Sequence, residues 1–113
     1  MNALHEVHDQ EKVARLAISM EENGWQGAPL VMWQVYGDLL TGTHRYEAAR
    51  HVLGWDDSEI PMIDITDVFE EAGMNFAEVL AEHGNPYLTE NAFVDVIYVL
   101  PTPIMEKYGL DIN

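Results

Sequence analysis

Residues 42–45, Gly-Thr-His-Arg, combine residue types that can bind phosphate. The glycine follows a short apolar stretch at 39–41, and the residues after the motif favour a helix. The start of a helix presents backbone N–H groups that have no partner in the helix, and the helix dipole is positive there. Those groups bind anions together with hydroxyl and guanidinium donors. The pattern therefore predicts a phosphate-binding turn formed by Gly42, Thr43, His44 and Arg45.

Each of these side chains also has an interpretation that needs no ligand. Thr43 is a suitable N-cap for the helix that follows, a role compatible with donating its hydroxyl to a phosphate. Arg45 would otherwise form an ion pair with Glu47 or Asp38, which would leave His44 exposed to solvent. A nucleophilic role for Thr43 is disfavoured because no evident base accompanies it.

A helix over residues 10–22 is predicted before the turn. Asp9 is a good N-cap for this helix, and Asn23-Gly24 supplies its end. Its apolar face is predicted to contain Val13, Leu16, Ala17 and Met20, which lie at positions i, i+3, i+4 and i+7.

The elements on either side of the turn are predicted from apolar runs and from glycine and proline positions. In order, we expect strands at 30–36 and 39–41, a helix at about 44–53, and a strand at 60–65. Gly37-Asp38 joins the first two strands, Gly54 ends the helix, and Pro61 favours a sheet edge or a strand start. The apolar face of the helix is predicted to consist of Tyr46, Ala49, Val52 and Leu53.

Residues 66–113 are predicted to be mainly helical. Thr66 or Asp67 caps a helical region that extends to His83 and is interrupted at Gly73 and Asn75. The remaining predicted features are a turn at 85–86, a segment at 89–100 that favours helix over strand, and a final helix from Thr102-Pro103 to Gly109.

Composition restricts the classes of function. The formal net charge is −15, and residues 51–113 carry thirteen acidic side chains against Lys107 alone. Such a surface repels DNA, so direct DNA binding is not expected. The acidic half is either a solvated face or a surface for a basic protein partner, including mimicry of nucleic acid.

The compartment is also predicted from composition. The chain has no cysteine, which excludes disulfides and thiolate chemistry and suits a reducing cytoplasm. No apolar run approaches the length of a membrane span, and the N-terminus lacks the parts of a signal peptide. We therefore expect a cytoplasmic protein with no membrane contact, of a size and charge that would suit a phage accessory factor.

Several positions around the turn follow one family pattern. They are Ser19-Met20 and Gly24 at the end of the first helix, Pro29-Leu30 before a strand, residues 42–45 at the turn, and Ala48-Ala49 in the helix after it. Over residues 12–65 this order resembles the ParB/sulfiredoxin superfamily, with room for only an abbreviated strand before Asp9. We therefore expect an α+β fold of one domain, 1–113. Its small mixed sheet and helices would form a ParB/sulfiredoxin-like core at 9–65, followed by an acidic, mainly helical C-terminal extension at 66–113.

The sulfiredoxin branch is the most similar in pattern. Its Lys-Val-x-x-Leu-x-x-Thr-Ile helix corresponds to residues 12–20, and its Gly-Cys-His-Arg-Tyr turn corresponds to residues 42–46. The resemblance implies that Lys12, Ser19, His44 and Arg45 contact a nucleotide. Thr43 stands where sulfiredoxins have their catalytic Cys, so sulfinic acid reduction is not expected. The Gly-Glu-Arg-Arg turn of ParB proteins is absent, and no helix-turn-helix domain follows.

Lys12 and Ser19 have simpler interpretations as well. Lys12 would face solvent and bridge to Glu11 or Glu22, and the Ser19 hydroxyl would bond back to the backbone of its own helix. No metal site is predicted, because His5 and His8 lack the spacing of a zinc motif.

The helix after the turn carries two polar pairs, and Trp25 directly follows the end of the first helix. We expect His51 to hydrogen-bond to Glu47, and Arg50 to bridge to Glu47 rather than to contact a ligand. Trp25 belongs to the core or borders a base pocket.

Two functions of different class follow. The first is a nucleotide- or phosphate-binding protein, as an ATP- or CTP-dependent hydrolase or phosphotransferase in which Mg²⁺ neutralises a nucleoside triphosphate. That chemistry needs a carboxylate near the phosphates, and Asp38 and Glu47 are the nearest in sequence. The second is a non-catalytic acidic module or inhibitor with a vestigial nucleotide site, which engages a protein partner through the acidic half.

Overall fold

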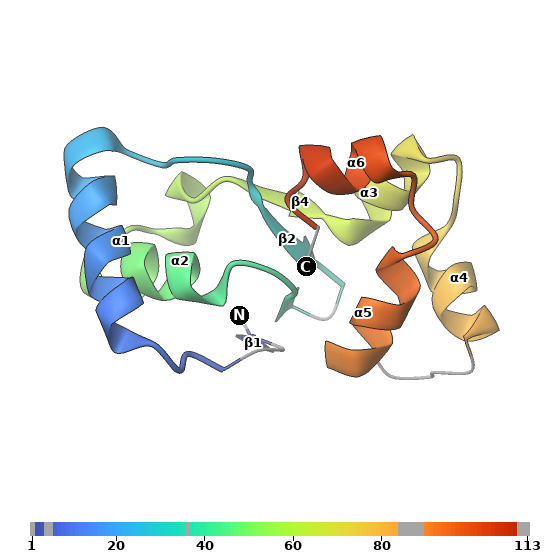
Figure 1. Cartoon of the computed structure of the whole chain (residues 1–113), viewed down its shortest axis with the longest axis horizontal. Coiled ribbons are helices and arrows are strands. Elements are labelled where there is room, and N and C mark those ends of the chain that lie inside the picture. The colour runs from blue at the N-terminus through green and yellow to red at the C-terminus, as the bar shows by residue number, and fades with distance from the viewer. Residues whose placement is uncertain (1, 4–5, 36, 84–89, 111–113) are drawn as a thin grey trace.

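The protein is an α+β fold built around one small mixed sheet (Figure 1). The computed structural model describes residues 2–3, 6–35, 37–83 and 90–110. Helices α1 and α2 lie on one side of the sheet, and α3 to α6 lie on the other (Figure 1). The predicted fold class, α+β with a small mixed sheet, is confirmed.

The sheet has four strands within the described residues, in the order β1-β3-β2-β4. Their bounds are β1 (Asn2–Ala3), β2 (Leu30–Trp33), β3 (Asp38–Leu39) and β4 (Met62–Asp64). Strand β2 pairs antiparallel with β3 and parallel with β4, and β1 pairs parallel with β3. Pro61 precedes the edge strand β4, as predicted, and its carbonyl accepts a hydrogen bond from the Leu30 N–H.

Strand β2 is shorter than the predicted 30–36. The chain turns at Gln34–Gly37, where the N–H of Gly37 donates to the carbonyl of Gln34 over 3.2 Å. Gly37 has a φ of 66°, a conformation that glycine adopts at low cost. The turn therefore begins three residues before the predicted position, and Tyr36 lies outside the described residues.

The helical elements confirm most of the predicted order. They are α1 (Gln10–Asn23), α2 (Thr43–Glu47), the π-helical turn η1 (Ala48–Val52), the 3₁₀ turn η2 (Asp57–Glu59), α3 (Ile65–Glu71), α4 (Phe76–Glu82), α5 (Glu90–Ile97) and α6 (Thr102–Lys107). Helix α1 begins and ends as predicted, because the Asp9 side chain accepts from the Lys12 N–H and Gly24 takes a φ of 74°.

The helix after the turn differs from the prediction in its second half. After α2 the N–H of Leu53 donates to the carbonyl of Ala48, a five-residue step that makes η1 a π-helical turn. The wider turn changes which residues face the core. Val52, predicted to be apolar and buried, is 56% exposed, whereas Ala48 is fully buried. The prediction for Val52 was therefore wrong.

The second half of the chain is helical as predicted, with one corrected boundary. The N-cap of α3 is Asp64, whose side chain accepts from the Thr66 N–H, so neither Thr66 nor Asp67 caps it. Asn75 caps α4, which confirms the predicted break. The segment predicted to favour helix over strand contains helix α5, and Phe93, Val96, Ile97 and Leu100 are buried there. The predicted turn at 85–86 lies outside the described residues.

The sheet separates two hydrophobic cores. Because side chains alternate along a strand, Leu30 and Leu39 face α1 and α2, whereas Val31 and Leu40 face the later helices. The first core contains Val13, Ala17, Met20, Leu30, Leu39, Tyr46, Ala48, Ala49 and Ile60. The second contains Val31, Leu40, Ile65, Val68, Phe69, Phe76, Leu80, Phe93, Val96, Ile97, Leu100 and Leu110. The acidic half of the chain thus covers one face of the sheet.

A side-chain hydrogen bond ends the β2–β3 pairing just before the turn. The fully buried Val31 donates its N–H to the Thr41 hydroxyl over 3.0 Å, and the N–H groups of Leu40 and Thr41 donate to the Val31 carbonyl. The Thr41 side chain thereby replaces a backbone acceptor. The β2–β3 pairing ends at this bond, and the chain leaves the sheet at Gly42.

Replacing Thr41 by valine should lower the free energy of unfolding by about 1–2 kcal/mol, because the buried Val31 N–H would lose its acceptor. Urea unfolding measures the change. Thr102→Val, at an exposed position in α6, is the matched control and should cost little. Equal losses in the two variants would contradict the role given to the Thr41 hydroxyl.

Candidate functional site

The turn begins at Gly42, which connects the end of the β2–β3 pairing to α2. Gly42 has φ 70° and ψ 34°, the left-handed conformation, and is the N-cap of α2. Thr43 is therefore the first residue of the helix, and its prediction as the N-cap was wrong. A Cβ atom built on Gly42 would overlap Cδ2 of Leu30, which is fully buried. Only glycine satisfies both constraints at this position.

Thr43 and His44 are the buried polar residues of the turn. They are 7% and 8% exposed, so the alternative that leaves His44 in solvent was wrong. The His44 ring packs against the ring of His8, with 4.8 Å between centroids, in the segment that leads into α1. The N-terminal segment therefore borders the turn.

Arg45 reaches back across the loop that follows α1. Its Nη1 donates to the carbonyl of Ala28 over 2.8 Å and to that of Gln26 over 3.4 Å. The guanidinium carbon lies 4.9 Å from the centroid of the Trp25 ring, within cation–π distance. These contacts replace the ion pair with Glu47 or Asp38 that was the alternative prediction.

Arg45 is one of two Lys or Arg side chains for which no ion pair is found within the described residues, and the other is the exposed Lys12. Three other basic side chains pair with carboxylates: Arg15 with Glu11, Arg50 with Asp57 and Lys107 with Glu71. Arg45 is half-buried, and burial lowers the pKa of its guanidinium. Within residues 2–3, 6–35, 37–83 and 90–110, no carboxylate pairs with it, and its Nε and Nη2 donate no hydrogen bond.

The two predicted ligands on α1 are not joined to the turn by polar contacts. The Lys12 side chain is exposed and Ser19 is half-buried. In the described part of the chain, no hydrogen bond or ion pair links either side chain to residues 42–45. Helix α1 nevertheless packs against α2 and η1, so both residues belong to the layer that carries the turn.

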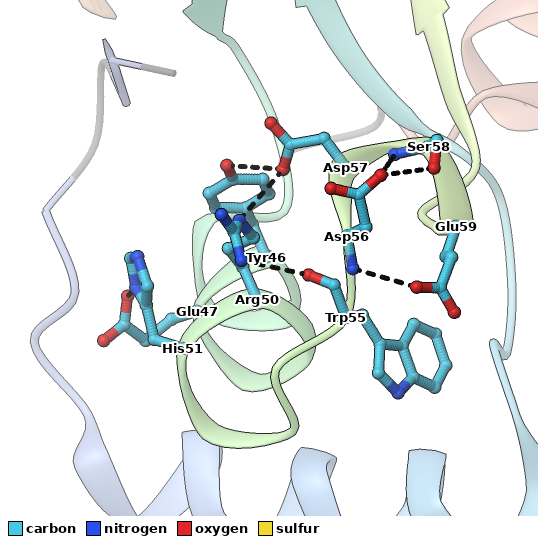
Figure 2. A network of polar contacts seen from close by, with 9 residues as sticks. All are labelled: Tyr46, Glu47, Arg50, His51, Trp55, Asp56, Asp57, Ser58 and Glu59. Atoms are coloured by element: carbon cyan, nitrogen blue, oxygen red, sulfur yellow. Dashed lines mark hydrogen bonds and ion pairs between the residues drawn. The ribbon is translucent and has the colours of Figure 1, made fainter.

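A polar network joins α2 and η1 to the loop that follows them (Figure 2). The Tyr46 hydroxyl donates to Oδ1 of Asp57 over 2.8 Å, and Nε of Arg50 lies 3.5 Å from the same oxygen. Arg50 also donates to the carbonyl of Trp55. The predicted Arg50–Glu47 bridge was therefore wrong. Glu47 accepts instead from His51 at 2.5 Å, which confirms the predicted pair.

The Asp57 network was missed at the sequence level, although one signal for its loop was present. Asp56 and Glu59 have the spacing of a capping box. The Asp56 side chain accepts from the Ser58 N–H, and the Asp56 N–H donates to Glu59, so this box forms η2 (Figure 2). It holds Asp57 opposite Tyr46 and Arg50.

Replacing Tyr46 by phenylalanine should cost about 1 kcal/mol of stability below pH 9, since the Asp57 hydrogen bond is lost. Burial, and then Asp57, raise the pKa of the Tyr46 phenol above 10.0. A raised folded-state pKa contributes stability that is present below the unfolded pKa and is lost as pH rises through the folded value. Urea unfolding between pH 8 and 11 should therefore show a smaller alkaline loss in Tyr46→Phe. The exposed Tyr98→Phe is the control, and an unchanged alkaline loss in Tyr46→Phe would contradict the expectation.

Metal-assisted phosphoryl chemistry at the turn would need carboxylates close to the phosphate. Of the two carboxylates nearest in sequence, Glu47 is bonded to His51 and Asp38 lies in β3. Among the described residues, no group of three or more His, Asp or Glu side chains is placed to hold a metal ion. At the turn, hydrogen bonds hold the Arg45 guanidinium beside Gly42. A guanidinium can bind an anion.

Comparisons of the chain with protein-family models, with curated proteins and with solved structures gave no significant match. No helix in the described part of the chain has the length and apolarity needed to cross a membrane. We therefore base the functional conclusion on the contacts of the turn.

Proposed function

We propose that this chain is a ParB/sulfiredoxin-like protein that binds the phosphate groups of a nucleotide at the Gly42–Arg45 turn. The observation that carries the proposal is the state of Arg45. In a chain of net charge −15, this half-buried cation has no carboxylate partner among the described residues, and its Nε and Nη2 donors are unused. A tetrahedral oxyanion matches the paired donors of such a planar fork.

The position of Gly42 supports the same ligand. A Cβ on this residue would lie 3.3 Å from Nη2 and 3.4 Å from Nε of Arg45. The unused edge of the guanidinium therefore lies over the one residue of the turn that has no side chain. The backbone of a glycine can approach a phosphate closely, here from the side that Cδ2 of Leu30 does not fill.

The order of elements supports the family assignment. A short strand, α1, two paired strands, α2 with η1, and a further strand follow one another between residues 2 and 64. This is the order that the ParB/sulfiredoxin pattern requires around its Gly-x-His-Arg turn. The family assignment is part of the proposal.

Thermal unfolding with ATP, CTP, GTP and ADP, each with and without Mg²⁺, tests the proposal. A nucleotide at 100 times its dissociation constant adds about 2.7 kcal/mol, which raises the midpoint by several degrees in a domain of this size. The absence of any shift with nucleotides and with inorganic phosphate would overturn the proposal. Phosphate release over hours separates a hydrolase from a protein that only binds.

A second candidate is an acidic binding module for a basic protein, with or without a nucleotide. The specific observation is that several exposed carboxylates on the second half form no ion pair within the described residues, namely Asp67, Glu70, Glu78, Glu82, Asp95 and Glu106. Lys107, the cation of that half, already pairs with Glu71.

Charge-reversal variants test whether binding of a partner depends on a specific acidic surface or only on the net charge of the protein. A binder captured from lysate should be lost when Glu78→Lys and Glu82→Lys are combined on α4, and its capture should weaken with salt. The matched control, Glu21→Lys with Glu22→Lys at the exposed end of α1, changes the net charge equally and should retain the binder. Equal loss in both variants would contradict a surface on the second half.

A further inference from the structure

Trp25 contacts Arg45 in a way that the proposed function does not yet use. The residue follows Gly24, which ends α1, and its side chain is half-buried. The guanidinium carbon of Arg45 lies over the Trp25 ring, 4.9 Å from its centroid. The Trp25 Nε1 donates to the carbonyl of Ala28 over 3.3 Å, and the same carbonyl accepts from Nη1 of Arg45.

These contacts hold the guanidinium on two sides. The Trp25 ring lies against the guanidinium carbon, and the carbonyls of Gln26 and Ala28 accept hydrogen bonds from Nη1. Within the described residues, Nε and Nη2 are the guanidinium nitrogens that donate no hydrogen bond, and they lie beside Gly42.

We propose that Trp25 is a positioning residue of the phosphate site, which orients Arg45 so that Nε and Nη2 meet an oxyanion side by side. The inference rests on the proposed function, and it names the residue that prepares the site for its ligand. A free arginine side chain loses rotamer freedom when it binds. An arginine already held by a ring and two carbonyls loses less, so its bidentate contact is stronger.

The role of Trp25 predicts graded effects on affinity. Trp25→Leu removes the ring and the N–H donor, and should weaken ATP binding about tenfold, the scale of a partly desolvated cation–π contact. Trp25→Phe keeps a ring face without the donor, and should lie between Trp25→Leu and the unaltered protein. Trp55→Phe, in the same hydrophobic core, is the control and should leave affinity unchanged. Calorimetric titration measures affinity, and denaturant unfolding verifies that each variant is folded.

A double-mutant cycle distinguishes positioning from a general structural role. If Trp25 acts through the guanidinium, Trp25→Leu should have little further effect on affinity in the Arg45→Lys background. An equal loss in both backgrounds would overturn the inference, as would an unchanged affinity in Trp25→Leu. If Trp25→Leu does not fold, the same cycle is made with Trp25→Phe. Absence of ATP and phosphate binding by the unaltered protein would overturn the proposed function itself, which is a separate result.

Discussion

Replacing Gly42 by alanine should lower the free energy of unfolding by about 2–4 kcal/mol, one of the largest effects expected from a single methyl group in this chain. Two costs combine. The left-handed conformation, φ 70°, is unfavourable for alanine, and the new Cβ would overlap the fully buried Leu30. Because Leu30 belongs to the first core and to β2, relief of the overlap would disturb both.

Gly54→Ala is the matched control for that prediction. Gly54 has nearly the same φ, 73°, but nothing lies within 4 Å of the Cβ that alanine would add. This variant should cost only the conformational term, roughly 1 kcal/mol. Urea unfolding of both variants isolates the packing contribution at Gly42. Equal losses would mean that the contact with Leu30 contributes nothing.

Replacing Arg45 by lysine should weaken nucleotide binding by about a hundredfold. Lysine retains the positive charge but loses the planar fork, so two charge-assisted hydrogen bonds to the phosphate become at most one. Each bond of this kind contributes about 1.5–3 kcal/mol, and 1.4 kcal/mol corresponds to a factor of ten in affinity. Calorimetric titration with the nucleotide that gives the largest thermal shift measures the change.

Arg50→Lys is the control for Arg45. Arg50 lies five residues further along the same helical segment and pairs with Asp57 and the Trp55 carbonyl (Figure 2). Its replacement should leave nucleotide affinity unchanged. Titrations should be made well below the unfolding midpoint of each variant, because Arg45→Lys also removes the bonds to Gln26 and Ala28. Unchanged affinity in Arg45→Lys would exclude the proposed site.

The local elements of the fold could be predicted because their signals lie within a few residues of one another. The Asp9 side chain caps the start of α1, and Gly24, which has a positive φ, ends it. The same logic failed at Ala48–Val52, where a π-helical turn adds a residue and exposes Val52. The contact that accompanies this turn, from the Trp55 N–H to the Ala49 carbonyl, involves the chain after Gly54 and has no periodic signature.

The candidate site could be predicted in its residue types but not in its contacts. The partners of Arg45 are the carbonyls of Gln26 and Ala28, and a carbonyl is present at every residue, so no side chain indicated them. Asp57 could not be identified as the partner of Arg50 because the chain reverses between them. Helical spacing predicted Glu47 as the partner of Arg50, because it is the nearest acid on the same helix.

The alternation of Leu30 and Val31 has a consequence for how the molecule unfolds. Neighbouring residues of one four-residue strand belong to different cores, so neither core can melt without removing strand contacts that the other needs. We therefore expect one cooperative transition in which both halves of the chain lose structure together. A phosphate bound at the turn would then slow amide hydrogen exchange in α3 and α5 as well as in α1, since it stabilises the single native state that all three share.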